Sequence, residues 1–444
     1  MIKYKDIIGI GFGPANISLA ITIEEKAPEM DVLFLESNQD IVWHPDAQFA
    51  GTDIQNHPLR DLVTPRNPKS HYSFTNFLKE TGRLFKHLNL PLTYPLRKEY
   101  AQYIKWVGGH FYNKVQYNKR VINIDIVCEN NIHKGYKVTT DDGRNYFSKA
   151  IVIAPGRTPY IPSVLEKASS KRIIHFNKLI STLSSLENEG NTPKNIAVIG
   201  GSQSAVEIIL DLRNRYKNCT LHGITRSFGY RQKDASPFMG EVYFPEHCNF
   251  YFDANKKGKE ELDRDLLFTN YSAADKDVVD SLYVQIYEES ITENQRVFVV
   301  TNREIMQAEE INNRLKLTLI NRYSNQIEEL DFDLVIAATG FRNIGIDENQ
   351  ERVPPILDRI SEHLDLDELG CIVIHRDYNL RTLSTIAENR PIMLNGLCEK
   401  SHGMGDAGSL SLVSLRSEII LNHVISKLQQ GDPVSLPNRI ELYS

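Results

Sequence analysis

Two glycine-rich turns in the sequence have the spacing that binds the pyrophosphate of a dinucleotide. In the first, GFGPAN, Gly11 and Gly13 take the first two glycine positions of the G-x-G-x-x-G pattern; Pro14 follows, and Asn16 takes the third position. The first glycine allows a tight turn, and the second leaves room for a pyrophosphate at the positive end of a helix. Glu36 ends the next apolar run, where its carboxylate can accept hydrogen bonds from ribose hydroxyls. A carboxylate repels a 2′-phosphate, so this turn predicts FAD or NAD.

The second turn, GGSQSA, begins with Gly200 and Gly201 and has Ala205 at the third position. The next apolar run ends in ITRS, which has no acidic residue and places Arg226 where the first unit has its carboxylate. A guanidinium at this place suits a 2′-phosphate, although an arginine at a strand end can also be merely solvated. The pair of turns therefore predicts FAD at the first and NADPH at the second.

The elements around the turns define the expected fold. Each turn lies between an apolar run typical of a buried strand and a stretch with helical spacing, so each belongs to a β–α–β unit. AIVIAPG leads out of the first unit, and DLVIAATGF, with Thr339 and Gly340, leads back; we expect these two residues to contact cofactor. We therefore expect an α/β fold with two Rossmann-like dinucleotide-binding domains, the second inserted in the first, plus a small, mostly helical substrate region. The expected FAD-binding domain covers residues 1–165 and 336–444, with substrate-region segments around 43–120 and 395–425, and the NADPH-binding domain covers 190–335, with a helical substrate-region insertion around 228–291.

Composition excludes several classes of protein. The net charge of −6 gives no reason to expect a nucleic acid or an anionic membrane as partner. The five cysteines are scattered and none forms a CxxC pair, which argues against a disulfide reductase, a disulfide framework or a metal site. No run reaches the roughly 18 apolar residues of a membrane span, and we expect a cytoplasmic protein without metal.

Further segments are similar to those of the microbial N-hydroxylating monooxygenases, the flavin-dependent ornithine and lysine N-hydroxylases and related amine N-monooxygenases of siderophore pathways. These segments are VWHPD, LRDLVTPRNPKSHYSFTNFL, SPFMGEVYFPE, TNYS, AATGF and HGMGD, together with both glycine-rich turns. The resemblance implies that NADPH reduces FAD, that O₂ then forms a C4a-hydroperoxyflavin, and that oxygen is transferred to a neutral primary amine to give a hydroxylamine. It also implies a homo-oligomer, a dimer or a tetramer.

The resemblance assigns roles to individual residues. Those implied beside the flavin are Trp43, His44, Gln55 and Arg97. Those implied at the nicotinamide coenzyme are Gln203, Ser204, Arg226 and Arg231. Asn270 of TNYS is implied where substrate and NADP⁺ meet, and the residues predicted to be catalytic are Gln55, Arg97 and Asn270.

The segments expected to line the substrate site depart from the family pattern. Arg60 stands where amino-acid hydroxylases usually have a lysine for the substrate carboxylate, and Gly240 stands where they usually have an asparagine. The C-terminal segment that contains Ser409 is about one residue longer. We interpret these differences as favouring a decarboxylated amine such as putrescine, cadaverine or histamine. The alternatives are L-ornithine or L-lysine and, in another class, an NADPH oxidase or reductase that hydroxylates no amine.

Overall fold

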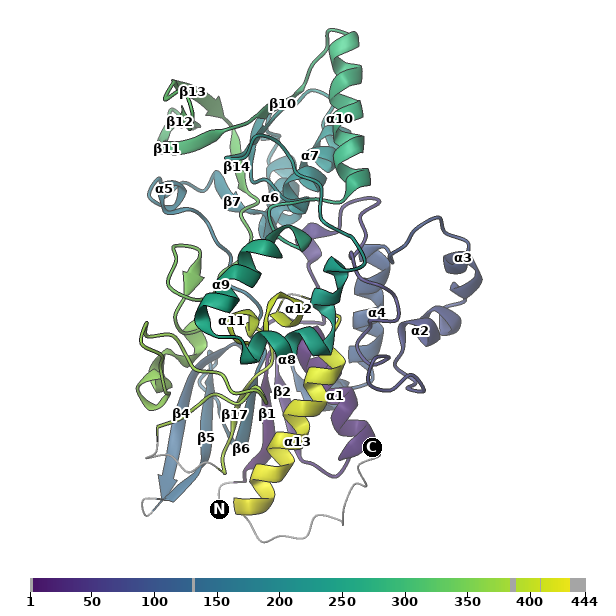
Figure 1. Ribbon diagram of the computed structural model, residues 1–444, viewed down its shortest axis with the longest axis vertical. Helices are drawn as coiled ribbons and strands as arrows, with labels where there is room; N and C mark the ends of the chain where they lie inside the picture. Colours follow the sequence, from purple (N-terminus) through teal and green to yellow (C-terminus); the bar gives the residue numbers. More distant parts are fainter. Residues whose placement is uncertain (1–2, 130–131, 384–388, 408, 432–444) are drawn as a thin grey trace.

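The computed structural model describes residues 3–129, 132–383, 389–407 and 409–431. It contains one mixed and one parallel sheet, and each carries one glycine-rich turn (Figure 1). The first sheet has the strand order β3-β2-β1-β6-β5-β4, with β17 paired to β6. Strands β1, β2, β3, β6 and β17 pair in parallel, and β4, β5 and β6 form an antiparallel meander. The strands are β1 (Lys5–Ile10), β2 (Val32–Leu35), β3 (Val115–Gln116), β4 (Val121–Glu129), β5 (Ile132–Thr140), β6 (Asn145–Ile153) and β17 (Ile392–Leu394).

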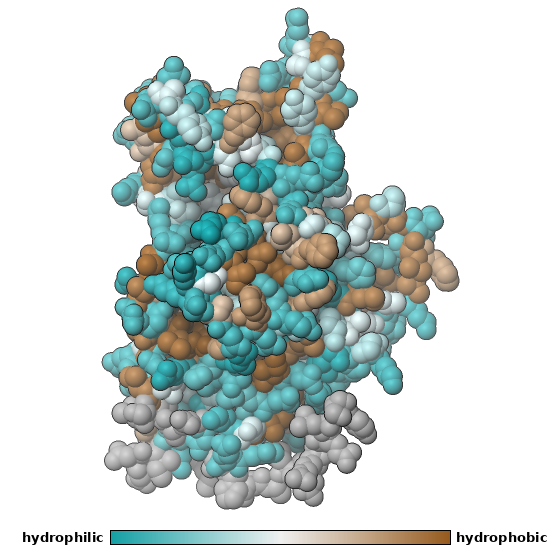
Figure 2. Space-filling view, in the orientation of Figure 1, coloured by the Kyte–Doolittle hydropathy of each residue, from teal (hydrophilic) through white to brown (hydrophobic). Residues whose placement is uncertain are grey.

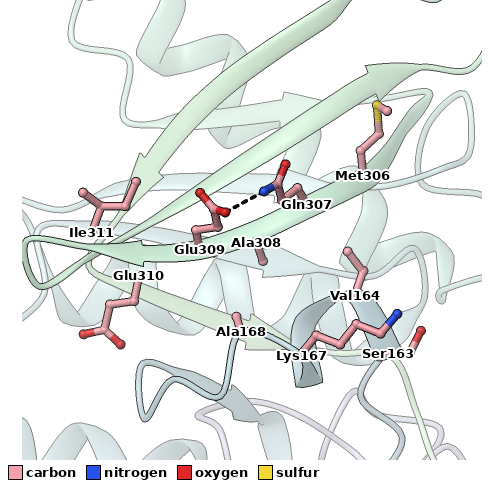
Figure 3. A pocket seen from close by; sticks show the side chains of 10 residues that line it. All are labelled: Ser163, Val164, Lys167, Ala168, Met306, Gln307, Ala308, Glu309, Glu310 and Ile311. Carbon is pink, nitrogen blue, oxygen red and sulfur yellow. Dashed lines mark hydrogen bonds between the residues drawn. The ribbon is translucent and has the colours of Figure 1, made fainter.

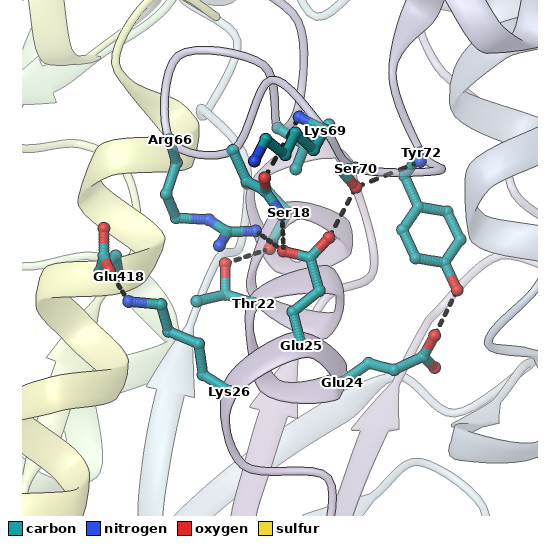
Figure 4. A network of polar contacts seen from close by, with 12 residues as sticks. Ser18, Thr22, Glu24, Glu25, Lys26, Arg66, Lys69, Ser70, Tyr72 and Glu418 are labelled. Carbon is teal, nitrogen blue, oxygen red and sulfur yellow. Dashed lines mark hydrogen bonds and ion pairs between the residues drawn. The ribbon is translucent and has the colours of Figure 1, made fainter. Parts of the chain in front are cut away.

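Helix α1 (Pro14–Lys26) starts directly after β1 because Gly13 caps it and Pro14 fills its first turn, where the missing N–H costs nothing. The apolar side chains of α1 are buried against the sheet, and the C-terminal helix α13 (Val413–Gly431) packs on its other side (Figure 1). A polar network ties α1 to the loop that follows residue 61 (Figure 4): Glu25 pairs with Arg66 and accepts from Ser70, and Tyr72 donates to Glu24. This loop, which carries part of the predicted substrate region, is thereby fixed to the first domain.

The second sheet is entirely parallel and has the order β10-β9-β8-β14-β7. Helices α6, α7 and α10 cover one face, and the other face meets a three-stranded antiparallel sheet, β11-β12-β13. The strands are β7 (Ile173–His175), β8 (Asn195–Ile199), β9 (Thr220–Ile224), β10 (Val297–Val300), β11 (Arg303–Ile311), β12 (Arg314–Asn321), β13 (Ile327–Phe332) and β14 (Leu334–Ala337); the helices are α6 (Leu179–Asn188), α7 (Gln203–Arg215) and α10 (Lys276–Ile291).

The strands of the second sheet fall between those of the first in the sequence, which is the arrangement expected of an inserted domain. They extend slightly beyond the expected range of 190–335, because β7 starts at residue 173 and β14 ends at residue 337. Part of the helical insertion expected at 228–291 belongs to the second domain instead: α10 packs on α7 and buries Leu282 in the core of that domain. The part of 228–291 that lies outside this core is therefore the segment before α10.

The remaining helices lie beside and between the two sheets (Figure 1). Helix α4 places Tyr100 and Tyr103 in an aromatic cluster with Phe74 of α2. Helices α8, α11 and α12 pack together in the middle of the molecule. Their bounds are α2 (Phe74–Glu80), α3 (Leu84–Leu88), α4 (Arg97–Gly109), α5 (Ser163–Glu166), α8 (Pro245–Asp253), α9 (Lys256–Asp265), α11 (Glu399–His402) and α12 (Met404–Ala407), with short strands β15 (Asn343–Ile344) and β16 (Gln350–Glu351) and 3₁₀ turns η1 (Pro45–Ala47), η2 (Tyr112–Lys114), η3 (Phe176–Lys178), η4 (Met239–Tyr243), η5 (Leu267–Thr269) and η6 (Pro355–His363).

The surface seen in Figure 2 is mainly hydrophilic, with apolar side chains gathered on the lobe of α2 and α3, where Phe85 and Leu88 are exposed. Within the described part of the chain, no helix is long and apolar enough to cross a membrane. A cavity of about 650 Å³ lies between α5 and β11 (Figure 3), where Gln307 donates to Glu309. None of its lining residues belongs to either glycine-rich turn.

Candidate functional site

The first glycine-rich turn has the geometry of a dinucleotide cradle. Gly11 has a φ of +81°, and a Cβ on it would lie 2.3 Å from the carbonyl oxygen of Ala154, so only glycine fits. A Cβ on Gly13 would meet no atom within 4 Å. The space in front of the α1 N-terminus is therefore open, and the free N–H groups there suit a pyrophosphate.

Glu36 is fixed beside this turn. It is 8% exposed, and its Oε2 accepts a hydrogen bond of 2.7 Å from the N–H of Phe12, within the turn itself. Its Oε1 accepts from the backbone N–H of Asn38 at 2.8 Å. The same Oε1 also accepts from the side-chain amide of Asn38 at 2.8 Å, so its lone pairs are used within the protein. The carboxylate is thereby held in place, and Oε2 keeps a lone pair for a ribose hydroxyl.

Asn16, at the third position of the first turn, supports the turn from within. Its Nδ2 donates to the carbonyl of Gly11 at 2.7 Å, and its Oδ1 accepts from Asn395 at 3.1 Å. Asn395 in turn accepts from Arg416, which is buried in an ion pair of 2.7 Å with Asp406. The asparagine thus links the cradle to α13 by a buried polar chain, and its amide is directed at protein atoms.

The second turn repeats the backbone plan. Gly200 has a φ of +155°, and a Cβ on it would lie 2.4 Å from the carbonyl oxygen of Ala338. A Cβ on Gly201 would lie 2.8 Å from the hydroxyl of Thr225, at the end of β9. Here Gln203 opens α7, followed by Ser204, and the Gln203 side chain accepts from the N–H of Asp275 at 2.7 Å. The turn is therefore tied to the start of α10.

Arg97 joins the two domains. It lies at the start of α4, and its guanidinium makes a bidentate ion pair with Glu207 of α7, at 3.0 and 3.2 Å. The same guanidinium donates to the carbonyls of Ala47 at 2.8 Å and Asp53 at 3.1 Å. Both side chains of the pair are largely buried, so this is a strongly oriented contact between the predicted flavin and nicotinamide sides.

Gln55 belongs to the same junction. Its φ is +53°, unusual for a residue with a side chain, and its Nε2 donates to the carboxylate of Asp275. Asp53, whose Oδ1 accepts from the N–H of Gln55 at 2.9 Å, has its pKa raised to about 6 by burial and by the negative charges of Asp275 and Glu207. We call Asp53, Gln55, Arg97, Glu207 and Asp275 the junction cluster.

Trp43 and His44 lie next to this cluster. The Trp43 ring contacts those of His44, at 5.0 Å between centroids, and Tyr100, at 5.7 Å. His44 has a φ of +45°. The residue is exposed at the surface, but protein atoms around its ring reduce its solvation, and with the nearby charge of Arg97 this lowers the pKa of His44 to about 4. The imidazole is neutral at physiological pH.

The residues predicted for the far end of the coenzyme have different surroundings. Arg226 is exposed directly after β9, whereas the guanidinium of Arg231 stacks over the ring of Phe268 at 3.8 Å. The Thr339 hydroxyl donates to the carbonyl of Tyr160. Gly340 has a φ of +80°, and its carbonyl accepts a hydrogen bond from His175 at 2.7 Å. Thr339 and Gly340 therefore stabilise the segment after β14 that leads from the second domain back to the first.

The predicted substrate residues lie in segments outside the two glycine-rich turns. The Arg60 guanidinium lies 5.7 Å from the ring centroid of Phe244 and forms no ion pair with any residue that the structure describes. Gly240 lies in η4 with open space where a Cβ would be, and Asn270 follows η5. Ser409 donates to Ser411 at 2.8 Å.

A hydrogen-bonded chain connects two of these predicted positions. Ser411 donates to Asn56 at 3.1 Å, and Asn56 donates to the carbonyl of Arg60 at 2.6 Å. Ser409 and Arg60, distant in sequence, therefore belong to one network, which supports the prediction that both face the same site.

Comparison with known proteins identifies the family. The family model for L-lysine 6-monooxygenase/L-ornithine 5-monooxygenase matches residues 3–343. An L-ornithine N(5)-monooxygenase of Pseudomonas aeruginosa is 30% identical over 434 residues, 96% of this chain and 95% of that protein. The chain belongs to this family.

Solved structures agree. An ornithine N-hydroxylase from Kutzneria sp. 744, in complex with reduced FAD, NADP⁺ and L-ornithine, is 28% identical with a TM-score of 0.88, over 96% of this chain and 100% of that one. An L-lysine 6-monooxygenase from Pseudomonas syringae is 30% identical with a TM-score of 0.84, over the same shares. The predicted α/β class with two dinucleotide-binding units is confirmed, as is the prediction of a flavin monooxygenase that uses FAD, NADPH and O₂.

A partly buried polar cluster of Arg157, Tyr271, Asn343 and Glu399 was not predicted from sequence. Tyr271 donates to the carboxylate of Glu399 at 2.6 Å, Asn343 donates to the same oxygen at 3.0 Å, and Arg157 contacts Asn343. Burial raises the pKa of Glu399. Three of the four residues lie within or just beyond a recognised segment: Tyr271 in TNYS, Asn343 after AATGF and Arg157 after AIVIAPG. This adjacency was the available signal, and Glu399 had none of this kind.

The structure also brings together Cys398, His402 and Asp406, whose potential ligand atoms lie within 4.8 Å of one another. Most of these atoms have protein partners, although Oδ2 of Asp406 has none among the described residues. Asp406 is paired with Arg416, His402 contacts Ser401 and the carbonyl of Arg376, and burial raises the pKa of Cys398 so that its thiol stays protonated. A guanidinium and a neutral thiol do not suit a metal ion.

Proposed function

We propose that this member of the family N-hydroxylates the side-chain amine of a diamino acid, L-ornithine first and L-lysine second, to supply hydroxamate groups for a siderophore. The observation that carries the proposal is the guanidinium of Arg60, which has no carboxylate partner among the described residues. From the family resemblance we expect this residue to face the carboxylate of the substrate. An arginine binds a carboxylate through two parallel hydrogen bonds. The initial preference for a decarboxylated amine is not confirmed, and the relatives, named for ornithine and lysine, fit the alternative better.

The charges around Arg60 also suit a zwitterionic substrate. Burial raises the pKa of Tyr94, the charges of Asp275 and Asp53 raise it further, and Arg60 lowers it, so all three charged residues lie near one ring. A cation and two anions around the same tyrosine match the α-carboxylate and the ammonium groups of a diamino acid. A simple diamine would leave Arg60 without a counter-charge.

The residues of the two turns hold the cofactors in this proposal. Gly11, Gly13 and Glu36 would hold FAD. Gly200, Gly201 and Arg226 would hold NADPH. The two cofactors, when bound, supply the reducing power and the oxygen chemistry. The junction cluster holds Gln55 and Arg97 in fixed orientations between the two coenzyme sides. His44, neutral in its protein surroundings, adds no positive charge near an amine that must lose its proton before it reacts.

The test is hydroxylamine formation with L-ornithine, L-lysine, putrescine, cadaverine and histamine, with peroxide measured in parallel. We expect ornithine or lysine to give coupled turnover. We expect Arg60→Gln to raise KM for the amino acid about 10- to 100-fold and to leave any slow diamine turnover unchanged, because only the amino acid has a carboxylate that Arg60 can bind. Arg83→Gln, at a half-buried surface arginine, is the control. Faster coupled turnover of a diamine or histamine than of either amino acid would refute the proposal, and peroxide as the only product with every amine would indicate an oxidase.

A further inference from the structure

A second arginine lies at the place predicted for the 2′-phosphate of NADPH. The Nη1 of Arg322, in the turn between β12 and β13, donates to the backbone carbonyl of Arg226 at 3.1 Å, although 96 residues separate the two in sequence. Both side chains are exposed. Arg226 is predicted from the sequence, but Arg322 is not, because a turn in a distant hairpin has no fixed spacing from the strand that it approaches.

Backbone hydrogen bonds explain why the hairpin turn is held there. The N–H of Arg303 donates to the carbonyl of Thr225 at 3.0 Å, and the N–H of Asn302 donates to the carbonyl of Ser227 at 2.9 Å, so the start of β11 docks on the end of β9. The N–H of Arg322 then donates to the carbonyl of Asn302 at 3.0 Å. The position of Arg322 therefore depends on main-chain contacts and not on its own side chain.

The two guanidinium groups have no anion to neutralise them. No residue in the described part of the chain forms an ion pair with Arg226 or Arg322, whereas Arg303 close by is paired with Glu328. The Arg322 guanidinium lies at the backbone of Arg226, so two cationic residues without a counter-ion among the described residues meet at this end of β9, and a phosphate there would neutralise them. The place is the carboxyl end of a parallel strand beside a glycine-rich turn, where this fold binds the adenosine part of a dinucleotide.

Arg231, the other arginine assigned to this phosphate from the resemblance, has a different environment. Its guanidinium stacks on Phe268, and its carbonyl accepts from the N–H of Ala274, next to the start of α10. We infer that Arg322 is a specificity-determining residue for NADPH, and that it binds the 2′-phosphate together with Arg226. This inference rests on the use of NADPH by the family and not on which amine the enzyme hydroxylates.

Binding of coenzyme fragments tests the inference without turnover. The dissociation constants of adenosine 2′,5′-bisphosphate and of 5′-AMP are measured by calorimetry on the flavin-loaded protein at low salt. Arg322→Gln keeps a donor for the Arg226 carbonyl but removes the charge, and we expect it to weaken bisphosphate binding about tenfold and leave 5′-AMP binding unchanged. Arg322→Lys keeps the charge, and we expect a loss below about threefold.

The matched control is Arg314→Gln on β12, a half-exposed arginine of the same sheet that lies 3.6 Å from Asp333. We expect it to bind both fragments as the unaltered protein does. In steady state, Arg322→Gln is expected to raise KM for NADPH about tenfold and leave KM for NADH unchanged.

Two results would overturn the inference. Unchanged bisphosphate binding in Arg322→Gln would show that the charge is not used, and an equal loss for bisphosphate and 5′-AMP would show that Arg322 only supports the loop. Absence of hydroxylamine with every amine would contradict the proposed function but would not alter either binding constant, so the two failures are distinguishable.

Discussion

The two glycine-rich turns share one backbone plan but have opposite surroundings. In both, a glycine at positive φ lies against a backbone carbonyl of a neighbouring segment: Gly11 against Ala154 and Gly200 against Ala338. The charged group of the first turn, Glu36, is buried and hydrogen-bonded to the turn itself. The charged group of the second turn, Arg226, is exposed, and no described residue pairs with its guanidinium.

This difference suits two cofactors with different residence times. A buried carboxylate that is already oriented loses little entropy when a ribose binds, which favours a flavin that stays in place. Exposed guanidinium groups bind a phosphate through charge and release it readily, which favours a coenzyme that must leave after turnover. The surroundings of the two turns thus favour a permanently bound flavin at the first and an exchanging coenzyme at the second.

Gly11→Ala and Gly201→Ala test whether bound FAD depends on the first turn and not on the second. At Gly11 the new Cβ meets a backbone oxygen at 2.3 Å and the φ is positive, so we expect at least about 3 kcal/mol of lost stability and loss of bound FAD. At Gly201 the neighbour is the Thr225 hydroxyl at 2.8 Å, which can rotate away, so we expect about 1 kcal/mol and normal flavin content. Urea unfolding and flavin absorbance measure both.

Gly143→Ala is the control for backbone conformation alone, because its φ is +79° and no atom lies near its Cβ position. We expect a loss of about 1 kcal/mol with full flavin content. Full flavin content in Gly11→Ala, or loss of flavin in Gly201→Ala, would contradict the assignment of FAD to the first turn and would remove the basis of the comparison.

The contact between the two coenzyme sides is the next target. Glu207→Gln leaves the buried Arg97 without its bidentate partner, so we expect a loss of about 2 to 3 kcal/mol in the free energy of unfolding. We also expect more peroxide per NADPH consumed, because Arg97 no longer has a fixed orientation. The double variant Arg97→Met/Glu207→Leu should recover part of the stability but not the coupling. Unchanged stability and coupling in Glu207→Gln would show that the domains are oriented by other contacts.

The parts of the site predicted from sequence are those set by local spacing. The two turns, Glu36 and Arg226 follow from the length of a β–α–β unit, since a strand, a turn and a helix fix where the next strand ends. The family resemblance added Gln55, Arg97 and the substrate residues, whose roles as cofactor or substrate ligands stay predictions.

The partners of these residues could not be predicted, because they come from distant segments. Glu207 and Asp275 meet Arg97 and Gln55 only because α7 and α10 of the second domain pack against the first. Asn16 was interpreted as a cofactor residue, yet its amide is used by Gly11 and Asn395, a pairing of residues 379 positions apart. Long-range polar contacts of this kind leave no periodic trace in a sequence.

Asp53 allows the smallest and most specific test of the boundary between the two sides. Its pKa is about 6 in the folded protein, above the value near 3.8 of a free aspartate, because it is buried near Asp275 and Glu207. The unfolded chain therefore loses this proton first as the pH rises from about 4 to 6, and stability falls over that window and levels off above it.

Asp53→Asn removes this titration and keeps an acceptor for the N–H of Gln55. We therefore expect the variant to gain about 1 kcal/mol over the unaltered protein between pH 4 and 7, a value reduced by the partial solvent access of the side chain. Asp141→Asn, the same substitution at an exposed turn, is the control. Urea unfolding at several pH values measures the effect, and an Asp53→Asn difference that stays constant with pH would mean that the acidic residues of the two domains do not interact across their boundary.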